Sequence, residues 1–346
     1  RAVDFTDQHV GPHGLAQGLR ADWNDCLNLG GGETALVSFL HVWAARLLAE
    51  TAAAIGRTDD AAHYTAMAER VAAVAERELW DGDWYLRGYT RDGVKIGSAS
   101  SPEGKIFLEH MGWAVMAQVA TGDHGRRALD AVQQHLASPF GLHLNWPSYT
   151  QVDDAIGYCT RVYPGVKENG AIFCHPNAWP IIAETILGNG DRAAAYYEAM
   201  APANANDTSE RRRSEPYVYA QFLFGRDHPF HGRAENPWLT GTAGWMYQAV
   251  SQHILGLRPG FDGLTVDPCV PRDWPGFTVQ RRWRGGTYLI EVANPAGVNA
   301  SVAAATLDGQ PLELVRDPLT GRPCARLPLS PGTHLVTITL GGQTAG

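Results

Sequence analysis

The residues with the clearest chemical potential in this 346-residue chain begin at Asp22, where two carboxylates flank an indole and an amide. The run Asp22-Trp23-Asn24-Asp25 precedes three glycines and a long apolar segment. A site that cleaves a glycosidic bond needs an acid to protonate the leaving oxygen, and an aromatic ring can cover the apolar face of a sugar. For an isolated Asp-Trp pair, however, loop acids and a core indole are the simpler interpretation.

A second polar segment, residues 163–179, leads into an apolar helix start and places Lys167, Glu168 and His175 within nine residues. Each of these has an ordinary explanation, because an exposed Lys-Glu pair contributes little and a lone histidine is usually structural. The combination of a cation, a carboxylate and an imidazole in one loop is what makes the segment a candidate site.

A third segment contains Thr240 and Gly241 just before a predicted helix. A hydroxyl and outward-facing backbone N–H groups at such a turn can hold an anion. A plain N-cap explains Thr240 equally well. The sequence of this segment alone leaves both interpretations open.

Helical periodicity dominates from about residue 33 to 256. It predicts a long helix over 33–55 that ends at Gly56, and a second helix from a Thr58 cap to about Trp80. The first helix is expected to bury Leu36, Phe39, Leu40, Trp43, Leu47 and Leu48. Further helices are predicted at 105–120, 123–137, 170–188, 190–201, 216–225 and 241–255. Paired helices with long loops on one side are typical of an α/α toroid whose loops carry function.

After Leu257 the pattern changes to short alternating or β-branched runs separated by Gly, Pro and Asp turns. Strands are predicted at 264–266, 277–279, 288–292, 301–303 and 334–338, which together favour a β-sandwich. The predicted fold is therefore mainly α, over residues 1–256, followed by a C-terminal β domain over residues 257–346.

Composition excludes several classes of function. The formal net charge of −8 argues against nucleic acid and anionic membranes as partners. The sequence contains no uninterrupted run of about 18 apolar residues, so no membrane span is predicted. The five cysteines form no C-x-x-C pair, which favours reduced thiols and a cytoplasmic location. Because the chain opens directly at Arg1, we expect it to be a segment of a longer polypeptide whose N-terminal part is missing.

The three segments, together with residues 215–221, closely resemble the inverting disaccharide phosphorylases of glycoside hydrolase family 94. The resemblance continues through residues 80–85 and 261–268. It implies an (α/α)6 barrel, present here in part, followed by a β-sandwich. It also implies a homodimer, and cellobiose and inorganic phosphate as substrates.

Matched residue by residue, Asp25 takes the position of the family's general acid. Trp23 matches a wall of the donor-sugar subsite, and Gln221 matches a hydrogen-bonding partner of the same sugar. Asp22 is a rival acid, since it lies three residues before Asp25, and the sequence by itself does not choose between the two. An acid that works at neutral pH also needs enclosure and nearby negative charge to keep its proton.

Tyr163, Lys167 and Glu168 match positions on the acceptor-sugar side. Pro176 departs from the polar residue found in cellobiose-cleaving relatives, which leaves the acceptor sugar open. Cellobionic acid, N,N'-diacetylchitobiose and laminaribiose are therefore alternative substrates.

His175, Thr240 and Gly241 match the phosphate site. Phosphate is already an anionic nucleophile, so a phosphorylase needs no second carboxylate to activate water. Neither a cofactor nor a metal site is expected. Two other interpretations remain: an inverting α/α-barrel hydrolase that uses Glu168 as base, and an inactive sugar-binding fragment.

Overall fold

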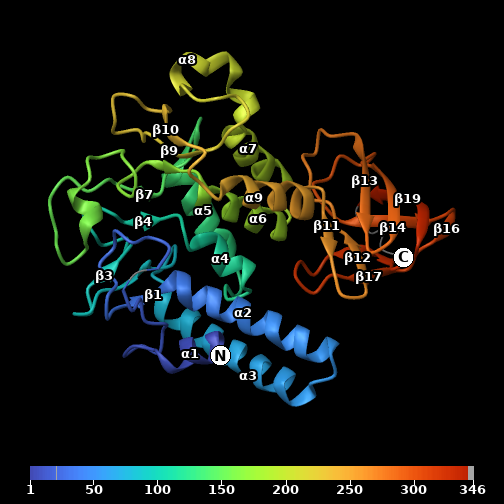
Figure 1. Ribbon diagram of the computed structural model, residues 1–346, viewed down its shortest axis with the longest axis horizontal. Coiled ribbons are helices and arrows are strands. Elements are labelled where there is room, and N and C mark those ends of the chain that lie inside the picture. The colour runs from blue at the N-terminus through green and yellow to red at the C-terminus, as the bar shows by residue number, and fades with distance from the viewer. Residues whose placement is uncertain (21, 342–346) are drawn as a thin grey trace. The chain divides into compact units, whose positions relative to one another are not determined.

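The structure is a computed structural model that describes residues 1–20 and 22–341, and the chain forms two compact units. The first unit contains Arg1–Pro180 and Ala199–Ala243, and the second contains Ile181–Glu198 and Gly244–Gly346. Figure 1 locates the elements of each unit. The chain mixes helices and sheets, and its C-terminal part is β-rich, as the sequence predicts.

The first unit holds most of the helices. Its described short strands form two three-stranded and two two-stranded sheets, which long loops connect. Its helices are α1 (Ala2–Gln8), α2 (Ala35–Ala54), α3 (Thr58–Leu79), α4 (Met111–Met116), α5 (His124–Leu136), α8 (Ser209–Arg212) and the 3-10 turns η1 (Tyr158–Arg161), η2 (His175–Asn177) and η3 (Pro202–Thr208). Its strands are β1 (Glu33–Thr34), β2 (Gly88–Tyr89), β3 (Lys95–Ile96), β4 (Ile106–Phe107), β5 (Ala137–Ser138), β6 (Gly141–Leu142), β7 (Asn145–Trp146), β8 (Ile172–Phe173), β9 (Ala220–Leu223) and β10 (Ala234–Pro237).

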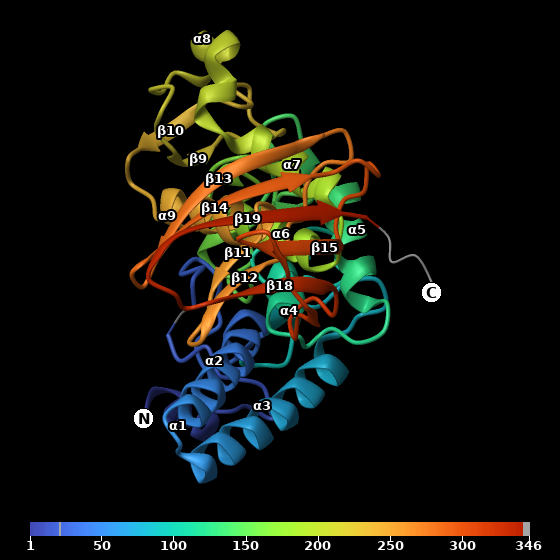
Figure 2. The same cartoon turned by 90° about the vertical axis from the view of Figure 1, so that its right-hand side faces the viewer.

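Two long helices of the first unit, α2 and α3, pack side by side as a hairpin (Figures 1 and 2). Gly56 ends α2 as predicted, because its φ of 76° lies in the left-handed region that a side chain disfavours. Thr34 caps the start of α2 by accepting from the Val37 N–H. The predicted Thr58 cap is wrong: Thr58 is the first helical residue of α3, and Arg57 occupies the cap position without a side-chain bond.

The buried face of α2 differs in part from the prediction. Leu36 and Phe39 are buried, but Trp43 and Leu47 are 37% and 41% exposed. The small residues Ala45, Ala49 and Ala52 take the buried positions, since they allow the close approach of α3. Among the described residues α2 has the length and hydropathy of a membrane-crossing helix, and half of it is buried inside the protein.

Three predicted helices give way, wholly or in part, to strands. The helix predicted over 170–188 begins only at Ala178, because Ile172–Phe173 form β8. Residues 216–225 contain β9, because Phe222 and Leu223 pair with β8 on one side and with β10 on the other. Residues 105–120 contain β4, which pairs with β7, so only Met111–Met116 are helical. In the resulting three-stranded sheet β9 lies between β10 and β8.

The second unit consists of two sheets and helical segments. Three helices lie across the division between the units, namely α6 (Ala178–Ile186), α7 (Gly190–Met200) and α9 (Thr242–Gln248), and α9 continues into the π-helical η4 (Ala249–Ile254). One sheet has the order β11-β12-β18-β17 and the other the order β13-β14-β19-β15-β16. The strands of the larger sheet lie side by side in Figure 2, and β15 also contacts β17 and β18 of the smaller sheet. Their bounds are β11 (Leu257–Pro259), β12 (Gly263–Val266), β13 (Gly276–Trp283), β14 (Gly286–Ala293), β15 (Val302–Leu307), β16 (Gln310–Pro311), β17 (Leu314–Arg316), β18 (Pro323–Pro328) and β19 (Gly332–Leu340).

The corrected face of α2 gives a test of stability. We expect Phe39→Ala to lower the free energy of unfolding by about 3–5 kcal/mol, because the fully buried ring packs edge-on against Tyr85. Leu47→Ala, an apolar truncation on the exposed face of the same helix, should change it by no more than about 0.5 kcal/mol. Urea denaturation measures both, and equal losses would contradict this assignment of the buried face.

Candidate active site

The loop that carries Asp25 is anchored by a buried ion pair. The Arg87 guanidinium lies 2.7 Å from Asp22 and 3.6 Å from Glu109, and all three side chains are fully buried. Asp22 also accepts from the Thr34 hydroxyl and from the Asn24 backbone N–H. Because so many groups fix this carboxylate, the chain that follows it has a defined path.

Asn24 extends this anchor toward the functional residues. Its side-chain amide donates to Glu109 at 2.9 Å, and its side-chain oxygen accepts from the Cys26 backbone N–H at 3.2 Å. Asn24 is 1% exposed, whereas its neighbour Asp25 is exposed. The polar network therefore holds the backbone on either side of Asp25 and leaves the Asp25 carboxylate accessible.

The structure distinguishes the two acids that the sequence left open. Burial opposes ionisation of Asp22, but the charge and hydrogen bonds of Arg87 outweigh it and lower the pKa of Asp22 below its usual value. An ionised carboxylate locked against a buried guanidinium is unsuited to donate a proton. Asp22 anchors the loop, whereas the Asp25 carboxyl group lines the cavity.

The turn that carries Lys167 and Glu168 is held by a second buried asparagine. The side chain of Asn169 accepts from the Tyr149 N–H at 2.7 Å and donates to the carbonyls of Tyr149 and Val162. Lys167 has a φ of 43°, which a tight turn requires here. Asn169 is fully buried, and its side-chain bonds to backbone groups fix the turn while the preceding Lys167 and Glu168 line a cavity.

The β8-β9-β10 sheet positions the other wall. Phe173 ends β8, and His175 follows immediately at the start of η2. Gln221 lies on β9, and its backbone carbonyl accepts from the Cys174 N–H at 3.0 Å. Thr240 follows β10, and its hydroxyl accepts from the Thr242 N–H at 3.2 Å. Because α9 begins at Thr242, Gly241 occupies the N-cap position and Thr240 precedes it.

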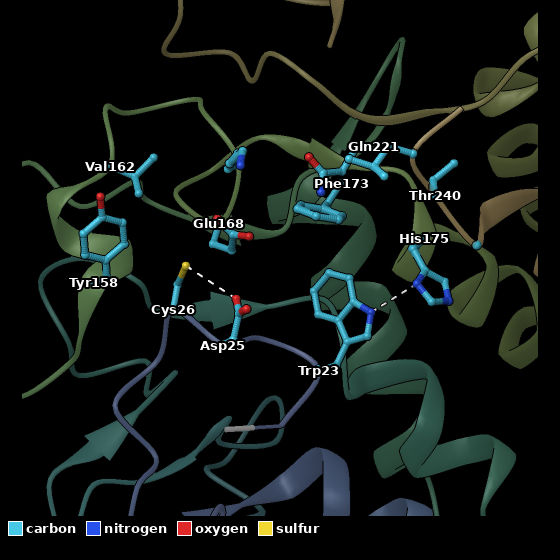
Figure 3. Close-up of a pocket in the computed structure, with 13 residues that line it drawn as sticks. Trp23, Asp25, Cys26, Tyr158, Val162, Glu168, Phe173, His175, Gln221 and Thr240 are labelled. Atoms are coloured by element: carbon cyan, nitrogen blue, oxygen red, sulfur yellow. Dashed lines mark hydrogen bonds between the residues drawn. The ribbon is translucent and has the colours of Figure 1, made fainter. Parts of the chain in front are cut away.

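A cavity of about 490 Å³ brings these segments together (Figure 3). Of the nine residues predicted for the site, eight line it: Trp23, Asp25, Lys167, Glu168, His175, Gln221, Thr240 and Gly241. Figure 3 shows Asp25 and Glu168 near each other and His175 and Thr240 on the far side of Trp23. Segments separated by up to two hundred residues thus form one polar-walled hollow.

Tyr163 is the predicted residue that does not line this cavity. It is 62% exposed and its ring lies edge-on to His228 at 5.7 Å. Five other lining residues were not predicted, namely Cys26, Tyr158, Val162, Phe173 and Leu239. Cys26, Val162 and Leu239 adjoin predicted residues in sequence, so proximity could have indicated them, whereas Tyr158 carries no sequence signal.

The comparison with known proteins decides the family. Residues 1–256 match the model of the Glycosyl hydrolase 94 superfamily, catalytic domain. The chain belongs to the glycosyl hydrolase 94 superfamily.

Two relatives and one solved structure add detail to this glycosyl hydrolase 94 assignment. The chain is 54% identical over 314 residues to N,N'-diacetylchitobiose phosphorylase of Vibrio proteolyticus, covering 90% of this chain and 39% of that protein. It is 36% identical over 314 residues to solabiose phosphorylase of Paenibacillus borealis, covering 89% and 41%. A sialidase structure aligns at a TM-score of 0.56 and 14% identity over 81% of this chain and 26% of that one, which is a likeness of fold alone. This chain thus spans about two fifths of the length of the two phosphorylases.

Within this glycosyl hydrolase 94 site, Cys26 lies between two carboxylates. Its Sγ is 3.8 Å from Asp25 Oδ1 (dashed in Figure 3). Burial, and then the nearby charges of Glu168 and Asp25, raise the pKa of Cys26 to about 12, so the thiol keeps its proton at neutral pH. One ligand atom from each of Asp25, Cys26 and Glu168 lies within 4.8 Å of the others, a spacing that could hold a metal ion. All five cysteines are free.

The anchor of the Asp25 loop gives a stability prediction. We expect Asp22→Asn to lower the free energy of unfolding by about 3–5 kcal/mol, because it removes the ionised partner of a buried guanidinium. Asp25→Asn, the same chemical change on an exposed side chain of the same loop, should stay within about 0.5 kcal/mol of wild type. Urea denaturation at pH 7 compares the two variants.

The difference in unfolding free energy between wild type and Asp22→Asn should depend on pH in a defined direction. Because the pKa of Asp22 is lowered in the folded state, the ion pair stabilises fully above the unfolded value of about 3.9 and is lost as pH falls through the folded value. Wild type should therefore lose its advantage over Asp22→Asn in acid. No advantage at pH 7, or an advantage that does not shrink as the pH is lowered below the unfolded value, would refute the anchor.

Proposed function

We propose that this chain supplies the acid and the phosphate site of an inverting disaccharide phosphorylase. The observation that supports it most strongly is that one cavity is lined by an accessible carboxyl group, Asp25, and by the separate group His175, Thr240 and Gly241. Trp23 lies between them and offers an aromatic surface to a sugar ring.

The chemistry requires one proton and one nucleophile. An oxygen of inorganic phosphate attacks the anomeric carbon while the glycosidic C–O bond breaks and Asp25 donates its proton to the leaving oxygen. A single displacement inverts the configuration, so a β-linked disaccharide yields an α-sugar 1-phosphate and the free acceptor sugar. No step uses a metal ion or an organic cofactor.

The hydrolase alternative is less well supported by the geometry. An inverting hydrolase keeps its two carboxyl groups about 6.5–9.5 Å apart so that a water molecule fits between them and the sugar. Oxygen atoms of Asp25 and Glu168 lie within 4.8 Å of each other. This spacing is too short for Glu168 to act as the water-activating base of such a pair.

For the substrate, we place N,N'-diacetylchitobiose first and cellobiose second. The support is the 54% identity to N,N'-diacetylchitobiose phosphorylase of Vibrio proteolyticus and the 53% identity to that of Vibrio furnissii. Cellobionic acid phosphorylase of Neurospora crassa is 28% identical. The order reverses the one favoured by the sequence motifs, while the reaction type stays the same.

We also propose that the active enzyme is a longer cytoplasmic polypeptide that forms a homodimer and completes an (α/α)6 barrel. The paired helices α2–α3 and α4–α5 are consistent with such a barrel. Two observations support additional polypeptide that covers these surfaces. The apolar side chains of Trp43 and Leu47 on α2 are exposed. Asp25 is also exposed, although a carboxyl group that acts as an acid needs an enclosed site to keep its proton. The relatives are also more than twice as long as this chain, since about 314 aligned residues make up only 39–41% of their length.

The acid role is tested by Asp25→Asn in the full-length polypeptide. We expect phosphorolysis of the disaccharide to fall by roughly 10²–10⁴-fold, the usual contribution of a general acid. A 2,4-dinitrophenyl β-glycoside needs no proton on its leaving group, so its phosphorolysis should fall far less. Initial rates with both substrates measure the difference.

Two results would contradict this assignment. Wild-type rates on the disaccharide in Asp25→Asn would remove the acid role from Asp25. Equal turnover of the disaccharide with and without inorganic phosphate, in the unaltered enzyme, would establish hydrolysis instead.

The requirement for further chain has its own test. We expect purified residues 1–346 to release no sugar 1-phosphate from N,N'-diacetylchitobiose or cellobiose, because Asp25 is not enclosed by the described residues. The full-length polypeptide at the same concentration is the positive control. Phosphate-dependent cleavage by residues 1–346 alone would overturn the proposal.

A further inference from the structure

One hydrogen bond joins the sugar-facing wall of the cavity to its phosphate-facing wall. Trp23 Nε1 donates to His175 Nδ1 at 3.1 Å, across 152 residues of sequence (dashed in Figure 3). An indole N–H can only donate, so Nδ1 of His175 must be the ring nitrogen without a proton. A neutral imidazole then carries its proton on Nε2.

Both partners of this bond are held in place by packing. The Trp23 ring lies edge-on to Phe173 at 4.9 Å and to Trp179 at 6.0 Å. The backbone after His175 is fixed by Asn177, whose side chain accepts from the Leu142 N–H and donates to the Leu142 and Phe173 carbonyls. The imidazole is therefore oriented by contacts that do not involve a substrate.

The same contact favours a neutral ring. A protonated imidazole would present an N–H at Nδ1 to the Trp23 N–H, and the two donors would repel each other. Burial acts in the same direction, because it lowers the pKa of His175. A Cβ built on Gly241 would lie 3.6–3.9 Å from three atoms of the imidazole, so Gly241 lies beside the His175 ring.

We infer that Trp23 is a positioning residue for phosphate: its indole N–H holds His175 in the tautomer whose Nε2–H is the donor offered to the nucleophile. This inference rests on the proposed function and extends it. Trp23 then has two separate duties, an aromatic face for the sugar and an N–H for the phosphate site. Loss of the N–H should weaken phosphate binding through His175 alone.

A double-mutant cycle in the full-length enzyme tests the coupling. At saturating disaccharide, Trp23→Phe should raise the KM for inorganic phosphate about three- to tenfold, the range for one lost hydrogen bond. In a His175→Gln background it should raise this KM less than twofold further, because a glutamine amide always has an N–H to donate and has no tautomer to select. The effect of Trp23→Phe on the disaccharide KM should be equal in both backgrounds and serves as the internal control.

The tautomer itself is measured in the wild-type enzyme, and a variant serves only to assign the signals. In the wild-type enzyme with ¹⁵N-labelled histidine rings, the His175 signals should show an unprotonated Nδ1 and a protonated Nε2, with and without inorganic phosphate. His175→Ala identifies these signals by their loss. An Nδ1-protonated ring or an imidazolium would overturn the inference.

The outcomes separate this inference from the proposed function. Equal fold-changes of Trp23→Phe in both backgrounds, with phosphorolysis intact, would overturn the inference alone. An unchanged phosphate KM in His175→Ala would overturn the proposed phosphate site and the inference together.

Discussion

The ion pair between Asp22 and Arg87 is the interaction on which the rest of the site depends. Both side chains are fully out of water, so each charge requires the other, and Glu109, Thr34 and Asn24 add further polar contacts to the pair. Such a pair stabilises little by itself compared with apolar packing, but it tolerates very few alternative arrangements. It therefore fixes where the chain leaves the core, and three residues later that path delivers an exposed carboxyl group to the cavity.

Three buried asparagines also fix loops around the cavity. Asn24, Asn169 and Asn177 are each 0–1% exposed, and each uses its amide to satisfy backbone or buried polar groups of a loop. A loop without regular structure leaves backbone donors and acceptors that cannot be buried unpaired. A buried amide offers both kinds of partner from one short side chain. The functional side chains sit directly beside these asparagines, and so they point outward from loops that are themselves rigid.

Local sequence patterns predicted those helices, strands and helix ends that depend mainly on nearby residues. The helix over Thr58–Leu79, the stop at Gly56 and the strands near 264–266 and 288–292 follow from periodicity and turn residues. Residues 216–225 were mistaken for a helix because their strand character comes from pairing with β8 and β10. The motifs placed eight of nine predicted residues at one cavity. The choice between Asp22 and Asp25 was beyond the sequence, because it depends on Arg87, 65 residues away. The link from Trp23 to His175 was equally beyond it, since no spacing rule connects residues 152 positions apart.

The central claim is a single displacement at the anomeric carbon by phosphate held across the cavity from Asp25. The most direct test is the ¹H and ³¹P NMR spectrum of the products formed by the full-length enzyme in its first turnovers on N,N'-diacetylchitobiose and inorganic phosphate. The account predicts an α-sugar 1-phosphate and an equal amount of the free acceptor sugar. A β-sugar 1-phosphate, which requires two displacements, or two free sugars without a phosphate ester, would contradict it.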